Sequence, residues 1–224
     1  HLTTTDPAEH LDFVIAQSDD VTISKIDEEV ELNKYKEEVL KTAKDSMSDN
    51  DIAYIEEDLR SPCTQEIALF RAFAEIVEKA DNEIVVIDTA PTGHTLLLLD
   101  ATESYHKEIQ RSQGNVPESV KKLLPRLRNK NETEVVIVTL PETTPVFEAL
   151  RLQEDLKRAG INNKWWIINS SLLLTETDNV FLKAKAQTEI TWINKVKEFA
   201  EDNVVVVPWQ GAEIKEENIR NLIN

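Results

Sequence analysis

The sequence is poor in several residue types, and each shortage excludes a class of protein. Among its 224 residues there is one cysteine, so neither an internal disulfide nor a CxxC zinc site can form, and this usage suits a reducing cytosol. Basic residues number 25 against 42 acidic ones, giving a net charge of −17. That balance argues against a nucleic-acid partner, which would require a basic face, but it is compatible with a protein partner that has a basic surface.

Long apolar segments are also missing. No run approaches the roughly 18 residues that a membrane helix needs, and no segment has the pattern of a secretory signal. Hydrophobic residues at 41% and charged residues at 30% are ordinary for a globular domain. We therefore expect a cytoplasmic protein with one good core.

Glycine is scarce, with four in the whole chain. No two of them have the spacing of the phosphate-binding loop G-x-x-x-x-G-K-[ST]. The sequence therefore lacks the element that most often holds nucleotide phosphates in α/β hydrolases.

What the chain does contain is organised around residues 83–95. An apolar, β-branched run ends at Asp88 and leads into a loop with threonines, Pro91, Gly93 and a histidine. Such a run predicts a fully buried parallel strand, and open α/β sheets bind ligands at the carboxyl ends of their strands. In nucleotide hydrolases an aspartate at that place holds Mg²⁺ beside the phosphates. The alternative is an aspartate that merely caps the following turn.

The remaining pattern alternates strands with helices, which predicts an α/β fold with a mostly parallel sheet covered on both faces. Further strands are expected at residues 21–26, 132–140, 164–169 and 203–207. Helices are expected at residues 28–47, 49–60, 96–110, 119–128, 146–159, 175–200 and 214–223. The strand at 132–140 is expected to be buried, and Gly160 is a good residue to follow the helix 146–159. The helix that follows Ser61 is expected to have an apolar face at helical spacing, made by Leu69, Phe70, Phe73, Ile76 and Val77. The two tryptophans within 164–169 are expected to pack on the sheet.

A helix start is predicted at Ser61, a good N-cap followed by proline at the first helical position. Cys63 then lies in the first turn, where free N–H groups and the helix dipole favour a thiolate, a ligand for soft ions such as trivalent arsenic or antimony. The alternative is a small cysteine that only packs.

Three motifs carry a resemblance to a known family: TDPA at residues 5–8, SPCTQEIA at 61–68 and DTAPTGHT at 88–95. Together they resemble the arsenical pump-driving ATPases (the ArsA family) and their relatives that deliver tail-anchored membrane proteins. The resemblance implies a doubly wound sheet of the P-loop NTPase type, with residues 1–224 as one ATPase half-domain, the C-terminal half of a pseudodimer. Helical segments at about 28–80 and 97–130 would flank the nucleotide core, the second as a mobile helical insert or an ordinary crossover.

In that family a phosphate loop precedes the TDPA segment. We therefore expect this chain to be a fragment that begins after that loop, truncated at the N-terminus. The alternative is a complete protein that has lost ATP binding.

The resemblance also assigns site residues. Asp6 would orient the attacking water, although an Asp-Pro turn or helix cap would explain it equally. Asp88 would hold Mg²⁺, and Cys63, His94 and Ser61 would bind the metalloid. Asn169 would read the adenine through its two-sided amide, or else be an ordinary strand-end turn residue. The nucleotide contacts implied by the match are Thr89, Pro91, Thr92, Gly93, Asn169 and Pro208.

By the same resemblance, the intact protein would be an ATP hydrolase that couples hydrolysis to arsenite or antimonite efflux. Its ligands would be ATP, Mg²⁺ and trivalent arsenic or antimony as an allosteric ligand. Its partners would be the N-terminal half or a second copy, and a membrane arsenite efflux protein to which it binds peripherally. Two rivals stay open: a targeting ATPase for tail-anchored membrane proteins, and a catalytically inert fragment. The targeting relatives lack the cysteine of SPCTQEIA, so Cys63 discriminates between these branches.

Overall fold

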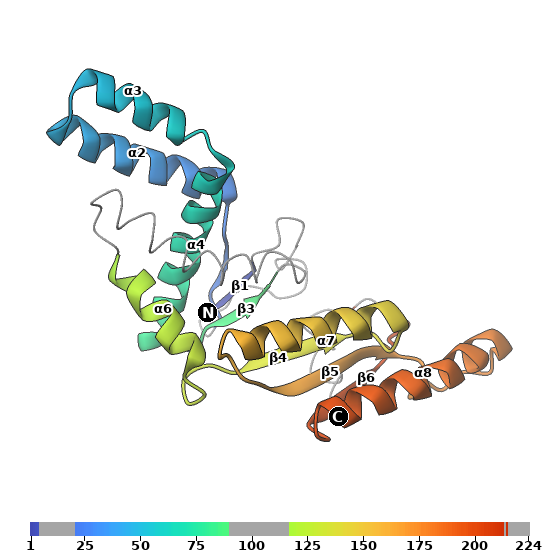
Figure 1. Ribbon diagram of the computed structural model, residues 1–224. Helices are drawn as coiled ribbons and strands as arrows, with labels where there is room; N and C mark the ends of the chain where they lie inside the picture. Colours follow the sequence, from blue (N-terminus) through green and yellow to red (C-terminus); the bar gives the residue numbers. More distant parts are fainter. Residues whose placement is uncertain (5–20, 90–116, 213, 215–224) are drawn as a thin grey trace. The chain divides into compact units, whose positions relative to one another are not determined.

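The computed structural model describes residues 1–4, 21–89, 117–212 and 214, arranged as parallel strands with flanking helices (Figure 1). The described residues form two compact units, one up to Pro125 and one from Arg126 onward. The first unit contains β1 (Leu2–Thr4), β2 (Ile23–Lys25), α2 (Glu28–Ser46), α3 (Asp49–Asp58), α4 (Pro62–Glu78), the 3₁₀ turn η1 (Lys79–Asp81), β3 (Val86–Asp88) and most of α6 (Glu118–Arg128). The second contains β4 (Val135–Thr139), α7 (Thr143–Arg158), β5 (Asn163–Ser171), α8 (Val180–Phe199) and β6 (Val204–Pro208).

The sheet of the first unit has the order β2-β1-β3, with both neighbours parallel to β1. The predicted strand before the DTAPTGHT loop is therefore present and parallel. Its burial was predicted wrongly, since Val86 is 54% exposed. The reason is its place in the sheet: β3 is an edge strand among the described elements, paired with β1 alone.

Helix α4 supplies the core of the first unit. Its predicted apolar face is confirmed, with Phe70, Phe73 and Val77 buried. Helix α2 packs against it, and the two are joined at the surface by ion pairs from Lys34 to Glu75 at 3.1 Å and from Arg71 to Glu38 at 2.8 Å. Such exposed pairs orient the helices but contribute little, about 0–1 kcal/mol each.

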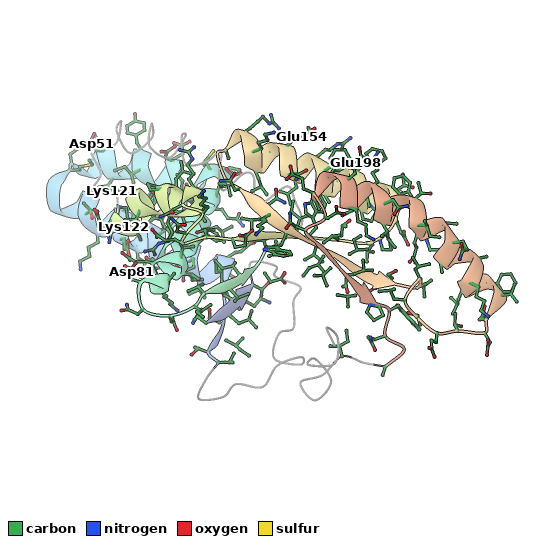
Figure 2. The ribbon with its side chains drawn as sticks, turned by 90° about the horizontal axis from the view of Figure 1, so that it is seen from below. Asp51, Asp81, Lys121, Lys122, Glu154 and Glu198 are labelled. Carbon is green, nitrogen blue, oxygen red and sulfur yellow. The ribbon has the colours of Figure 1, made fainter. Side chains whose placement is uncertain are left out.

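The sheet of the second unit has the order β4-β5-β6, and it too is fully parallel. Helices α7 and α8 lie side by side over one face of this sheet (Figure 2), joined by an edge-to-face contact between the rings of Phe147 and Trp192. Beneath them the core is built from Ile137, Trp166 and Ile168. The α/β class with parallel strands, predicted from the alternation of strands and helices, is thereby confirmed.

On the opposite face of this sheet, a second prediction of burial was wrong. Strand β4 was predicted to be buried, yet Val138 is 58% exposed while its neighbour Ile137 is buried. Trp165 on β5 is likewise 41% exposed, with the ammonium of Lys164 over its ring, whereas Trp166 packs as predicted. Successive strand side chains point to opposite faces, and α7 and α8 cover only one of them.

The end of α7 follows the sequence prediction. Gly160 was expected as the residue after the helix, and its φ of 76° is the left-handed conformation that glycine adopts without strain. Its N–H bonds to Lys157, and the N–H of Ile161 bonds to Leu156, which is the Schellman arrangement of helix ends. No helix in the described part of the chain is long and apolar enough to span a membrane.

Candidate functional site

In the first unit, the site residues lie where the strands end. Asp88 is the last residue of β3 and stands in register with Thr4, the last residue of β1. Asp88 and the following Thr89 are both exposed. A carboxylate and a hydroxyl thus sit at the carboxyl edge of a parallel sheet, where α/β proteins bind ligands.

Five of the predicted site residues lie outside the described residues: Asp6, Pro91, Thr92, Gly93 and His94. Their predicted roles toward water, nucleotide and metalloid stay predictions.

The start of α4 follows the sequence prediction closely. Ser61 is the N-cap, its hydroxyl accepts from the N–H of Cys63 at 3.2 Å, and proline occupies the first turn. Thr64 strengthens the turn by donating its hydroxyl to the carbonyl of Asp58 at 3.2 Å. Cys63 itself is exposed. The exposed position is incompatible with the alternative of a cysteine that only packs in a core, and it leaves the thiol reachable by a ligand.

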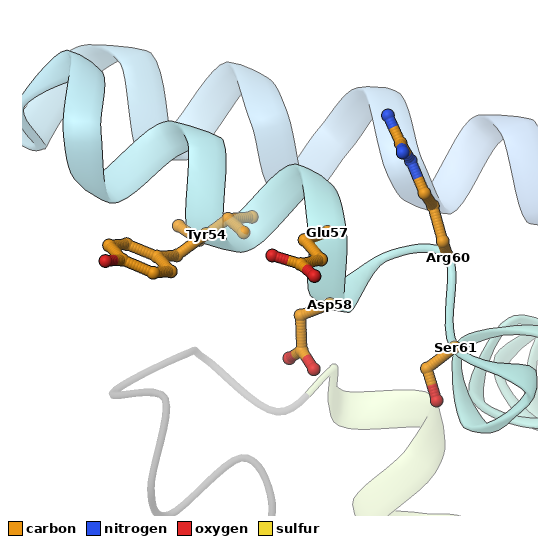
Figure 3. Close-up of a pocket in the computed structure, with 6 residues that line it drawn as sticks. Tyr54, Glu57, Asp58, Arg60 and Ser61 are labelled. Atoms are coloured by element: carbon orange, nitrogen blue, oxygen red, sulfur yellow. The ribbon is translucent and has the colours of Figure 1, made fainter.

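An open depression of about 650 Å³ adjoins this turn on the α3 side (Figure 3). In the close-up, Asp58 and Ser61 point to the same side, away from α2, while Arg60 points the opposite way. The depression is lined by Tyr54, Ile55, Glu57, Asp58, Arg60 and Ser61. Its two carboxylates make it unsuited to an anionic ligand such as the phosphates of ATP.

In the second unit, Asn169 lies on an irregularity of β5. Ile168 pairs with Val206 and Ser171 with Pro208, so β5 advances three residues while β6 advances two. The extra residue forms a β-bulge, a device that redirects side chains and is frequent next to active sites. The next residue, Ser170, has a φ of 56°, a conformation that costs a non-glycine residue about 1–3 kcal/mol.

The bulge leaves Asn169 exposed at the end of the strand. Its Oδ1 accepts from the N–H of the neighbouring Ser170 at 2.9 Å, and both residues still belong to β5. This contact leaves the NH₂ group of the amide available to a ligand, so both interpretations of Asn169 stay predictions.

Pro208 lies at the same end of the sheet, beside Ser171. The carbonyl of Ser171 accepts from the N–H of Trp209 at 2.9 Å and from the hydroxyl of Thr175 at 3.1 Å. The same hydroxyl lies 3.2 Å from the carbonyl of Trp209. Two predicted nucleotide contacts, Asn169 and Pro208, are therefore brought together around one buried serine.

The structure also reveals a residue that the sequence reasoning missed. Glu189 of α8 is only 2% exposed, and its carboxylate accepts from the hydroxyl of Ser171 at 2.8 Å. A signal for it was present in the sequence, since Glu189 interrupts the helix-spaced buried stripe of Ala186, Ile193 and Val196. A charged residue in such a stripe needs a buried partner.

Mg²⁺ takes oxygen ligands, usually one or two carboxylates together with substrate phosphates and water. Asp88 fits that role, because it is an exposed carboxylate at the strand end. In the described ranges no group of three or more histidine, cysteine or acidic side chains could hold a metal ion. A magnesium ion at Asp88 would take its other ligands from substrate phosphates, from water or from residues outside the described ranges.

Parallel sheets with flanking helices and polar residues at the strand ends define the class of α/β proteins that bind ligands at this edge of the sheet. The sequence profile of the anion-transporting ATPases matches residues 2–116 and 101–222. The chain belongs to the anion-transporting ATPase family, which confirms the resemblance that the three motifs carry.

Individual proteins that are similar to this chain support the same family assignment. The arsenical pump-driving ATPase of Escherichia coli is 46% identical over 93% of this chain, and that of Acidiphilium multivorum is 45% identical over 93%. The chain spans 36% of the length of each of these curated relatives. The ATPase asna-1 of Caenorhabditis elegans is more distant, at 28% identity over 69% of this chain and 56% of its own.

Proposed function

We propose that the intact protein hydrolyses ATP to drive the efflux of trivalent arsenic or antimony through a membrane pump partner. One observation carries the proposal: the chain is 46% identical to an arsenical pump-driving ATPase over 93% of its length. The SPCTQEIA cysteine supports it, because Cys63 is exposed at the start of α4.

The proposed roles follow from chemistry and position. Asp88 supplies a carboxylate for Mg²⁺, which would neutralise phosphate charge during hydrolysis. Asp6 accepts a hydrogen bond from the attacking water and orients it, as the family resemblance implies. Thr89, Pro91, Thr92 and Gly93 form the loop beside the phosphates, and Asn169 with the segment from Pro208 binds the adenine.

Cys63, His94 and Ser61 are the proposed metalloid ligands. One thiolate binds a trivalent metalloid weakly by itself, so further ligands would come from the other half of the pseudodimer or from a second copy. Metalloid would then draw the two halves together and favour the closed, hydrolysing arrangement by a shift in population. Metalloid acts in this scheme as both cargo and activator.

The test is the ATPase rate of the intact protein with increasing antimonite. We expect the rate to rise and then saturate. A protein that hydrolyses ATP at a rate independent of antimonite would instead fit the second candidate, a targeting ATPase for tail-anchored membrane proteins. That candidate predicts no dependence on Cys63.

A further inference from the structure

The carboxylate of Glu189 is the most deeply buried charged group in the described part of the chain whose role the proposed function does not explain. It lies in the third turn of α8, and it accepts hydrogen bonds from one short segment of the chain. Oε2 accepts from the hydroxyl of Ser171 at 2.8 Å and from the N–H of Leu173 at 3.2 Å, while Oε1 accepts from the N–H of Leu172 at 3.3 Å.

Three consecutive residues at the end of β5 are thus fixed by one side chain. The segment leaves the sheet directly after the bulge, and its N–H groups at Leu172 and Leu173 have no partner in the β5–β6 ladder. Both N–H groups are partly buried and therefore need partners; Leu173 also donates to the hydroxyl of Ser171 at 3.3 Å. A buried carboxylate can pair several at once, but it is an expensive group to bury for packing alone.

The segment that Glu189 fixes is continuous with the proposed base-binding residues. Ser171 follows Asn169 by two residues, and the intervening Ser170 holds the strained φ of 56°. On the other side, the carbonyl of Ser171 accepts from the N–H of Trp209 at 2.9 Å, next to Pro208. Ser171 therefore links both base-binding segments to Glu189.

From this connection we infer that Glu189 is a positioning residue for the adenine site: through Ser171 it sets the geometry of Asn169 and of the segment after Pro208. The inference rests on the proposed function, because it assumes that this edge of the sheet binds the base of ATP. Glu189 itself is a positioning residue rather than a catalytic one, because its buried carboxylate is occupied by the hydroxyl of Ser171 and the N–H groups of Leu172 and Leu173.

The decisive substitution is Glu189→Gln in the intact ATPase. Both carboxylate oxygens accept from backbone N–H groups, so whichever way a glutamine amide is turned, its NH₂ group faces another donor. The segment must shift to relieve this. We expect the ratio of kcat/KM for ATP over GTP to fall about tenfold, as lost alignment of one hydrogen bond to the base would produce, mainly through a higher KM for ATP.

A second variant tests the inference even if Glu189→Gln fails to fold. Ser171→Ala removes the hydroxyl that links Glu189 to β5 but leaves the charge and its two backbone donors in place, and we expect a smaller change in the same direction. The matched control is Ile193→Ala, which opens the same buried stripe one turn further along α8 without altering a polar contact. It should lower the melting temperature and leave the ATP/GTP ratio unchanged.

The outcomes separate the inference from the function on which it rests. If the intact wild-type protein neither binds nor hydrolyses ATP, the proposed function fails and the inference with it. If wild type is active but Glu189→Gln and Ser171→Ala only lower the melting temperature, Glu189 is structural and the inference alone is overturned. A fall in the ratio for Ile193→Ala equal to that for Glu189→Gln would overturn it as well.

Discussion

Replacing Cys63 by serine in the intact protein should abolish most of the stimulation of ATP hydrolysis by antimonite. The thiolate is a soft ligand for trivalent metalloids, and a hydroxyl is not. The substitution is otherwise mild, because the side chain is exposed and its N–H bond to Ser61 belongs to the backbone. Exposed substitutions of this kind usually change the free energy of unfolding by less than about 0.5 kcal/mol.

This change in the free energy of unfolding can be converted into an expected shift of the melting temperature. In a domain of about 150–250 residues, 1 kcal/mol corresponds to roughly 2–4 °C, so Cys63→Ser should move the melting temperature by less than about 2 °C. The matched control is Ser48→Ala, which removes the N-cap of α3 and leaves both Ser61 and Cys63 in place. Loss of the cap should destabilise the domain by about 1 kcal/mol and leave the stimulation by antimonite unchanged.

The assay is the ratio of stimulated to unstimulated ATPase rate over a range of antimonite concentrations, with thermal melts of each variant. Undiminished stimulation in Cys63→Ser would refute a ligand role for the thiol. A large drop in melting temperature with the ratio unchanged would show that the side chain acts in packing, contrary to its exposure.

Three further outcomes are expected. In the intact protein, Asp88→Asn should abolish hydrolysis while leaving the fold intact, because the amide lacks the charge that a metal–phosphate site requires; near-normal turnover with a normal melt would make Asp88 structural. Residues 1–224 by themselves should bind Mg-ATP only at roughly millimolar concentration or worse, since their sequence has no phosphate-loop motif; micromolar affinity by titration calorimetry would contradict this. The hydrogen bond to Glu75 raises the pKa of Lys34 above its ordinary value of 10.5, so the pair stabilises the fold below about that pH and loses this effect as the pH rises through the raised pKa. For this exposed pair, Glu75→Gln should lower the free energy of unfolding by at most about 0.5 kcal/mol at neutral pH. Urea unfolding of wild type and variant should show this difference at neutral pH and no difference in strongly alkaline buffer.

Helix ends and single strands were well predicted because each is determined by a few residues that are neighbours in the sequence. Ser61 and Pro62 specify a helix start within two residues, and Gly160 specifies a helix end by its conformational freedom. The strand that ends at Asp88 follows from six neighbouring residues. These features also place Cys63 in the first turn of α4, as the sequence led us to expect.

The wrong or missed predictions concern features that depend on contacts between parts of the chain far apart in the sequence. The exposure of Val86 depends on the place of its strand at the edge of the sheet, and that of Val138 on which sheet face the helices cover. A run of valines specifies neither. The bulge at Asn169 depends on the pairing of β5 with β6, some 35 residues further along the chain. The partner of Glu189 lies 18 residues away, at Ser171, so a sequence pattern could flag the buried charge but could not identify what it holds.

The most direct test of metalloid efflux is the arsenite content of metalloid-sensitive bacterial cells that express the intact protein together with an arsenite efflux membrane protein. Compared with cells that carry the efflux protein and the Asp88→Asn variant, cells with the wild-type ATPase should accumulate less arsenite. Equal accumulation in the two strains, with both proteins present at equal levels, would contradict the proposed role as the motor of an arsenical pump.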